Sequence, residues 1–179
     1  RDWSSDVCSS DLLAARAVAQ GMIERGEITD MRSAFDWLCR NCAYSKESLD
    51  DAWATGALFY GRASCNGTSL ALKAFLDELG IPCVVQTGTV TSTVASGYHA
   101  WNEVYVDGGW YLIDAALMKN GSLYLVPVST ITSNFSRNGV TFRYNYLSSL
   151  AGEKARAACL DSFAPLEPSA QPLTYEKQE

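Results

Sequence analysis

The chain has 179 residues, of which 47% are apolar, 11% aromatic and 19% charged, and its formal net charge is −6. This length is enough for one compact domain with a sizeable core, and the composition excludes a disordered, coiled-coil or collagen-like chain. The acidic excess, with no run of lysine or arginine, argues against binding to nucleic acid or to an anionic membrane. With one histidine in the chain, a histidine-rich metal centre is excluded as well.

The two ends of the chain differ in composition from its centre. Residues 1–12, Arg-Asp-Trp-Ser-Ser-Asp-Val-Cys-Ser-Ser-Asp-Leu, resemble the translated read-through of a common sequencing adapter, so we interpret them as non-native. Residues 151–179 are interpreted as a C-terminal helix and a proline-containing tail or linker, in which the prolines stand among polar residues. We therefore expect one domain over residues 13–150, with further domains lost at either end.

Three segments before residue 80 predict helices. An early helix is expected over residues 13–25. Apolar residues at helical spacing predict a second helix over residues 30–43, with Asp30 or Thr29 as its N-cap. The clearest i, i+3, i+4, i+7 pattern predicts a third helix over residues 66–79.

The period of the pattern changes after residue 80. Runs of β-branched and aromatic residues separated by glycine-rich turns predict strands. The strands are expected at residues 84–85, 98–106, 110–114, 123–128 and 140–146. The Thr/Ser/Gly-rich stretch before Tyr98 is compatible with a loop over a cleft, and residues 148–160 predict a short helix. Helices followed by an antiparallel sheet define the α+β class.

Cys65 stands in Ala-Ser-Cys-Asn-Gly-Thr, at the start of the clearest predicted helix. The positive end of a helix stabilises a thiolate, which lowers the cysteine pKa and makes the side chain nucleophilic. A small buried cysteine near a helix cap is an equally ordinary structure. The position of Cys65 therefore does not by itself assign a function.

His99 and Asp114 supply the partners that a cysteine nucleophile needs. A base must accept the thiol proton, and His99 is the chain's single histidine. Asp114 ends an apolar strand, where an unpaired buried carboxylate would be costly. A two-residue turn at residues 107–108 pairs Val106 with Gly109 and puts His99 and Asp114 on one face as diagonal neighbours. A three-residue loop would put them on opposite faces.

Other cysteines and tryptophans allow competing interpretations. Cys39-x-x-Cys42 is compatible with a redox pair or half a zinc site, but no second pair completes a zinc tetrad, so we favour packing on the apolar stripe of the helix. Cys83 is expected in the core. Trp101 and Trp110 flank the proposed site, where they could bind sugar or peptide, or pack as half-buried sheet aromatics.

From about Phe35 to Met118 the chain resembles the transglutaminase-like superfamily, in particular bacterial transglutaminase-like domains, whose core shares the papain-like cysteine-protease architecture. The motifs that carry the resemblance are Cys-Ala-Tyr at 42–44, Gly-Ala-Leu at 56–58, Gly-Arg-Ala-Ser-Cys at 61–65, Gly-Ile-Pro-Cys-Val-Val-Gln-Thr-Gly at 80–88, His-Ala-Trp-Asn-Glu-Val at 99–104 and Asp-Gly-Gly-Trp-Tyr-Leu-Ile-Asp at 107–114.

The resemblance implies an α+β fold with the nucleophile at a helix N-terminus, and a catalytic triad of Cys65, His99 and Asp114. The implied activity is acyl transfer from an amide of a protein or peptide substrate through a thioester, which passes to an amine or to water. Neither a cofactor nor a metal is expected, nor insertion of this segment into a membrane, and a cell-envelope or secreted location is favoured by resemblance alone. Substrate contacts are expected from Trp101, Thr68 and Tyr98.

Several positions depart from the family pattern. Thr68 and Ser69 stand where the family often has Tyr-Ala, and residues 115–117 replace a frequent Thr and Trp. Papain-type enzymes place an oxyanion-binding Gln six residues before the Cys, and that position is Phe59 here. The alternative hypothesis is a catalytically inactive binding or structural module that keeps the fold.

Overall fold

The computed structural model describes residues 3–116 and 122–163. The helices are α1 (Trp3–Glu24), α2 (Met31–Asn41), α3 (Cys65–Glu78) and α4 (Ser149–Ser162), with short helical segments η1 (Leu49–Ala52), η2 (Gly56–Tyr60) and η3 (Val128–Thr130). The strands are β1 (Ala43–Tyr44), β2 (Arg62–Ala63), β3 (Cys83–Ser92), β4 (Ser96–Val106), β5 (Gly109–Asp114), β6 (Leu123–Pro127), β7 (Phe135–Arg137) and β8 (Val140–Tyr146).

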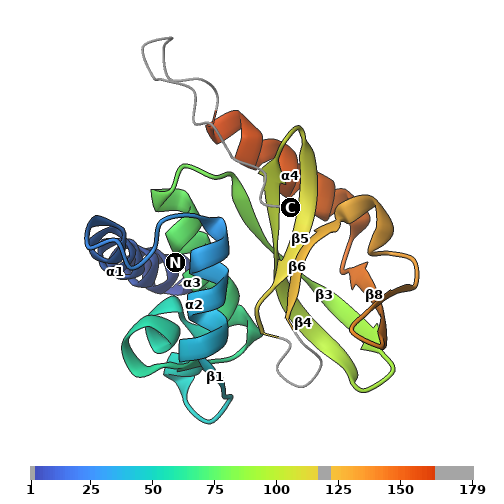
Figure 1. Ribbon diagram of the computed structural model, residues 1–179, viewed down its shortest axis with the longest axis horizontal. Helices are drawn as coiled ribbons and strands as arrows, with labels where there is room; N and C mark the ends of the chain where they lie inside the picture. Colours follow the sequence, from blue (N-terminus) through green and yellow to red (C-terminus); the bar gives the residue numbers. More distant parts are fainter. Residues whose placement is uncertain (1–2, 117–121, 164–179) are drawn as a thin grey trace.

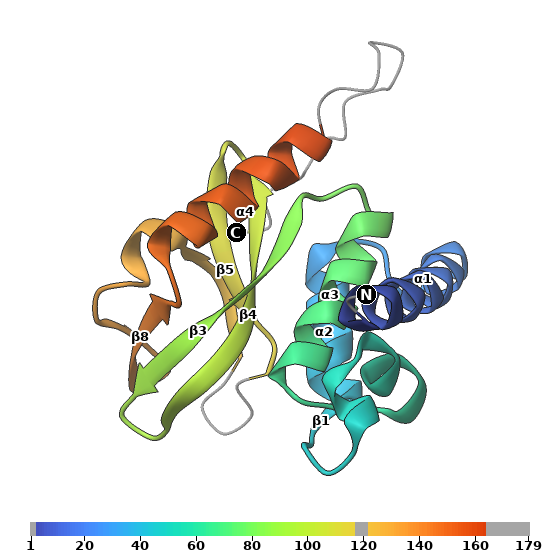
Figure 2. The same ribbon diagram turned by 180° about the vertical axis from the view of Figure 1, so that it is seen from behind.

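An antiparallel sheet forms the centre of the fold. Its six strands follow the order β6-β5-β4-β3-β8-β7, and β1 and β2 form a separate parallel pair. Helices α1, α2 and α3 gather on one side of the molecule, whereas α4 lies apart from them against the sheet (Figures 1 and 2). The predicted α+β class, with helices packed on an antiparallel sheet, is confirmed.

Helix boundaries follow capping chemistry where the caps are local. Asp30, one of the two predicted N-caps, accepts a hydrogen bond from the Ser33 amide at 2.7 Å and forms a capping box at the start of α2. Helix α3 ends before Gly80, whose φ of 74° fits the left-handed conformation that glycine tolerates after a helix. Helix α1 begins at Trp3 and not near residue 13, so it runs through the segment interpreted as non-native.

The sheet is larger than predicted. The Thr/Ser/Gly-rich stretch expected to form a loop is the end of β3 and the start of β4, which pair from Cys83↔Val104 to Thr91↔Ser96. Glycine has a weak preference for strands. Gly88 nevertheless lies within β3, because it pairs with His99 of β4 on one side and with Tyr146 of β8 on the other. A side chain at Gly88 would meet the Asn145 carbonyl oxygen at 1.9 Å, so this close approach requires glycine. The short strand β7 was not predicted.

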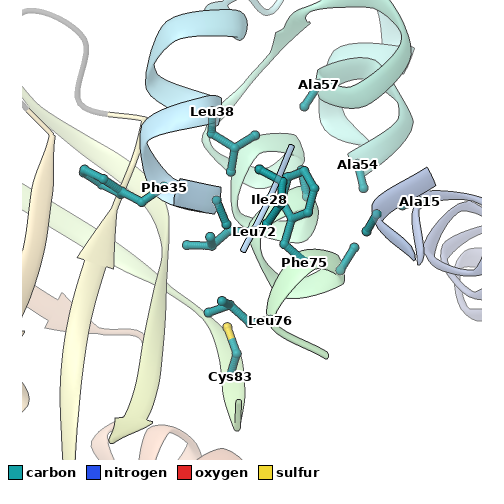
Figure 3. Close-up of a cluster of buried hydrophobic side chains, with 14 of the residues drawn as sticks. Ala15, Ile28, Phe35, Leu38, Ala54, Ala57, Leu72, Phe75, Leu76 and Cys83 are labelled. Atoms are coloured by element: carbon teal, nitrogen blue, oxygen red, sulfur yellow. The ribbon is translucent and has the colours of Figure 1, made fainter. Parts of the chain in front are cut away.

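Two buried clusters fill the molecule. The larger one joins α1, α2 and α3 to the sheet; it includes Ile28, Leu72, Phe75 and Leu76, and Cys83 lies at its edge (Figure 3). The smaller one lies within the sheet region and contains Trp101, Phe142 and Tyr144. The buried position of Cys83 agrees with the prediction.

Candidate active site

The N-terminus of α3, which carries Cys65, is docked onto η1 by backbone contacts. The Ser64 amide donates to the Asp51 carbonyl oxygen at 2.6 Å, and the Asn66 side chain donates to the Ala52 carbonyl at 2.8 Å. At Gly67 an added Cβ would lie 2.5 Å from the Asp51 carbonyl oxygen, so only glycine permits this approach. The glycine two residues after the cysteine therefore sets how closely the start of α3 approaches η1.

The carboxylate of Asp51 holds the loop that precedes η1. It is almost fully buried and accepts hydrogen bonds from Ser45 Oγ at 2.6 Å and from the amides of Glu47 and Ser48 at 2.9 Å each. These hydrogen bonds, led by the one from Ser45, hold the pKa of Asp51 below its ordinary value. Arg62 Nε lies 3.1 Å from its other oxygen. The backbone and side chain of one residue thus fix both the loop and the N-cap of α3.

Strand β4 is tied to α3 from the opposite side. Asn102 donates from Nδ2 to the Ser69 carbonyl oxygen at 2.9 Å, and Ser69 Oγ donates to the Cys65 carbonyl oxygen at 2.7 Å. Both Asn102 and Ser69 are buried, where hydrogen bonds that are lost leave costly unpaired groups. The strand that carries His99 and the helix that carries Cys65 are therefore held in register with each other.

The β4–β5 hairpin has the two-residue turn on which the site prediction depends. Val106 pairs with Gly109 and Asn102 pairs with Ile113. Asp107 has φ 50° and Gly108 has φ 78°, the left-handed values that this tight hairpin turn demands. The register predicted from the sequence is confirmed, and the alternative three-residue loop is not formed.

The hairpin brings His99 and Asp114 into direct contact. His99 Nε2 lies 2.6 Å from Asp114 Oδ2. The side chain of His99 is 9% exposed and that of Asp114 is 1% exposed. Burial lowers the pKa of His99, but the adjacent Asp114 charge and the hydrogen bonds to Asp114 and Cys65 outweigh it, and the pKa rises to about 10. The upward shift of the His99 pKa favours the protonated imidazole at neutral pH.

The Cys65 thiol completes the group. Because Nε2 of His99 is engaged by Asp114, Nδ1 is the ring nitrogen that remains for the thiol. Burial raises the pKa of Cys65, but the hydrogen bond and charge of His99, together with a hydrogen bond from the Ala100 amide, bring the pKa below its ordinary value. The structure thus brings together the three residues predicted from the sequence, and it favours the thiolate at Cys65.

Asp114 has two further hydrogen-bond partners that no motif in the sequence indicates. Tyr144, from β8, donates its hydroxyl to Asp114 Oδ2 at 2.6 Å, and the Ala116 amide donates to Oδ1 at 3.2 Å. Tyr144 is fully buried, and its ring lies 6.2 Å from the His99 ring between centroids. Nothing in the local pattern of 140–146 marks this tyrosine, because its partner lies 30 residues earlier in the chain.

Trp101 lies behind the site. It is fully buried, and its ring stacks on His99 with centroids 6.5 Å apart and planes 20° apart. Its Nε1 donates to Glu103 Oε2 at 3.0 Å. The substrate contact expected from Trp101 therefore disagrees with the structure, since a side chain without exposed surface cannot meet a substrate.

Glu103 is a buried carboxylate that links the sheet to α4. Its Oε1 accepts from Arg156 Nη1 at 2.7 Å and from Gln86 Nε2 at 3.0 Å, and its Oε2 accepts from Tyr146 at 2.5 Å in addition to Trp101. Glu103 has no exposed surface. Because Arg156 is the cation that compensates this buried charge, the stability of the fold is expected to depend strongly on Arg156.

The other expected wall residues differ in exposure. Thr68 is buried in α3, where its hydroxyl lies 3.8 Å from Cys42 Sγ, so it lines the interior and not a surface. Tyr98, which directly precedes His99 in β4, is 84% exposed. Phe59, at the position that holds an oxyanion-binding Gln in papain-type enzymes, lies in η2 and is largely exposed.

The remaining cysteines do not form the alternative sites. Cys39 is exposed and donates to Ser122 Oγ at 3.3 Å. Its predicted packing on an apolar stripe is wrong, because the buried residues of α2 are Ala34, Phe35 and Leu38. Cys42 is half-buried. Among residues 3–116 and 122–163, no group of histidine, cysteine or acidic side chains is arranged to hold a metal ion. Within the same residues, no helix has the length and apolarity needed to cross a membrane.

Comparison with known proteins identifies a family and several relatives of this chain. The profile of the transglutaminase-like superfamily matches residues 15–115. The kyphoscoliosis peptidase of Mus musculus is 27% identical over 132 residues, and the human one is 26% identical over 132 residues. The match covers 66% of this chain and 18% of each peptidase, so the chain spans less than a fifth of these relatives.

Two solved structures share the fold. A TGase crystal structure superposes with a TM-score of 0.51 at 18% identity, covering 72% of this chain and 38% of that one. A candidate cysteine protease from Cytophaga hutchinsonii superposes with a TM-score of 0.51 at 17% identity, covering 77% of this chain and 59% of that one. At these identities the likeness concerns the fold alone.

Proposed function

The chain belongs to the transglutaminase-like superfamily, and on that premise we propose that it is a cysteine-dependent acyltransferase or hydrolase acting on amides of protein or peptide substrates. The observation that carries the proposal is the 2.6 Å contact between His99 Nε2 and Asp114 Oδ2, with the opposite edge of the same imidazole turned to Cys65. This arrangement meets the needs of thiol catalysis, in which a base is held by a carboxylate beside the nucleophile.

The first half-reaction forms a thioester. The Cys65 thiolate attacks the amide carbonyl carbon, and the electron pair of the carbonyl moves to its oxygen. The Cys65 amide, at the start of α3, is proposed to donate a hydrogen bond to that oxyanion. The C–N bond then breaks as His99 gives its proton to the departing nitrogen, while Asp114 keeps the imidazole in the required orientation.

The second half-reaction releases the acyl group. A primary amine or a water molecule attacks the thioester carbonyl and gives its proton to His99. The C–S bond breaks, and Cys65 leaves as the thiolate that the imidazolium stabilises. The product is a new amide when an amine attacks and a carboxylic acid when water attacks. A substrate contact by Tyr98 stays a prediction, because successive side chains of a strand point to opposite faces and Tyr98 directly precedes His99 in β4.

The decisive assay offers a glutamine-containing peptide with and without a primary amine. Ammonia release together with amine incorporation is expected of a transglutaminase, whereas ammonia release or chain cleavage alone is expected of an amidase or protease. The matched control is the Cys39→Ser variant, which removes an exposed thiol away from the site and should turn over like the wild type. If neither product forms at any pH, the enzyme proposal fails and the inactive binding module is favoured.

A further inference from the structure

Tyr144 occupies an unusual position relative to the candidate site. Its hydroxyl and His99 Nε2 both reach the same oxygen, Asp114 Oδ2, and each distance is 2.6 Å. Tyr144 lies on β8, outside the 15–115 region that matches the superfamily profile. The carboxylate that orients the imidazole is therefore shared with a residue from the C-terminal part of the sheet.

The Tyr144 hydroxyl acts as a hydrogen-bond donor to Asp114. The ring is fully buried against Trp101, with centroids 5.0 Å apart, and the hydroxyl is turned inward to Asp114. Burial, followed by the Asp114 charge, holds the pKa of Tyr144 far above its ordinary value, so the phenol stays a hydrogen-bond donor. Packing alone would be served equally well by phenylalanine.

The hydrogen bond from Tyr144 to the shared oxygen weakens the interaction of that oxygen with the His99 imidazole. A carboxylate oxygen that accepts a phenol hydrogen bond carries less negative charge toward its other partner. In a site with little water, no solvent molecule compensates when such a donor is removed. Without Tyr144, Asp114 would hold the His99 proton more tightly.

We propose that Tyr144 is a positioning residue that fixes Asp114 Oδ2 and limits how strongly this carboxylate retains the His99 proton. The catalytic consequence rests on the proposed function, in which His99 must release its proton to the departing nitrogen. An imidazole that binds its proton too tightly is a poor general acid, because efficiency depends on proton affinity matched to the working pH.

The test is the titration of His99 by NMR in the full chain carrying labelled histidine, which gives one imidazole because the chain has one histidine. The wild type should titrate near pH 10. In Tyr144→Phe the midpoint should rise by about one unit, a tenfold change in proton affinity, and kcat on the peptide substrate should fall with KM little changed. A midpoint that stays in place or falls overturns the proposal.

Two further proteins keep the test informative. Tyr146→Phe removes a phenol from the same strand that donates to Glu103 and not to Asp114, so the His99 titration should not move. Replacing Tyr144 with 3-fluorotyrosine keeps the shape and strengthens the donor, so the midpoint should fall, and this result can be read even if Tyr144→Phe does not fold. A rise, or no change, contradicts the proposal.

The outcomes separate this inference from the proposed function. If the wild type has no turnover but the His99 midpoint moves as described, the role of Tyr144 stands and the enzyme proposal fails. If the wild type turns over and the midpoint does not respond to Tyr144, the enzyme proposal stands and this inference fails.

Discussion

The Cys65→Ser and His99→Gln variants are each expected to lose about 10⁴-fold or more in kcat/KM, and the double variant should lose no more than the worse single one. The reason is that thiolate and imidazolium act as one unit. Once either is gone, no bond to the acyl carbon forms at a useful rate, and removing the other changes little. The chain holds no second histidine that could replace His99.

The measurement is steady-state kinetics on the peptide substrate identified by the product assay, with all three variants prepared in parallel. Urea unfolding of each variant serves as the folding control. Additive losses in the double variant would show that Cys65 and His99 contribute independently, which contradicts the paired mechanism.

The second large effect concerns stability and the attachment of α4. Arg156→Met should lower the free energy of unfolding by about 3–5 kcal/mol, because it leaves Glu103 as a buried charge without a cation. The Arg156 side chain is 15% exposed, so solvent screening of this pair is weak. The remaining neutral donors on Glu103 cannot neutralise its charge.

Urea unfolding measures this effect, with one control variant and one rescue variant. Arg143→Met removes an exposed arginine from β8 and should change the free energy of unfolding by less than about 0.5 kcal/mol. Adding Glu103→Gln to Arg156→Met removes the uncompensated charge and should recover part of the loss. A loss below 1 kcal/mol in Arg156→Met would mean that Glu103 is not buried behind Arg156 in solution.

The parts of the site that could be predicted from the sequence depend on local rules. The Asp107-Gly108 turn fixed the pairing of β4 with β5, and this pairing brought His99 to Asp114. The start of α3 followed from its period, which put Cys65 at the helix N-terminus. Turn chemistry and helical period act over a few residues, so they can be seen in the sequence.

The parts that could not be predicted depend on long-range pairing. Strand β8 pairs with β7, its neighbour in sequence, and also with β3, which lies far earlier in the chain. The pairing with β3 brings Tyr144 to Asp114, and no local signal in the sequence specifies it. Trp101 was expected to contact substrate, but packing against Tyr144 and Tyr146 of β8 and a hydrogen bond to Glu103 bury it completely. Of the predicted C-terminal segment 151–179, with its helix and proline-containing tail, residues 164–179 lie outside the described residues.

The central claim is that Cys65 is activated by His99, and site-resolved alkylation tests it most directly. The full chain is treated with limiting iodoacetamide at pH 7, and the modified cysteines are identified by mass spectrometry. Burial raises the pKa of Cys39, Cys42 and Cys159, and that of Cys83 to about 12, whereas the pKa of Cys65 is lowered.

Cys65 should therefore react at least about tenfold faster than the more exposed Cys39, because the thiolate is the reacting form. In His99→Gln this advantage should disappear, since the imidazolium that stabilises the thiolate is gone. If Cys39 reacts as fast as Cys65 in the wild type, or if His99→Gln leaves the Cys65 rate unchanged, then Cys65 is not an activated nucleophile and the account is contradicted.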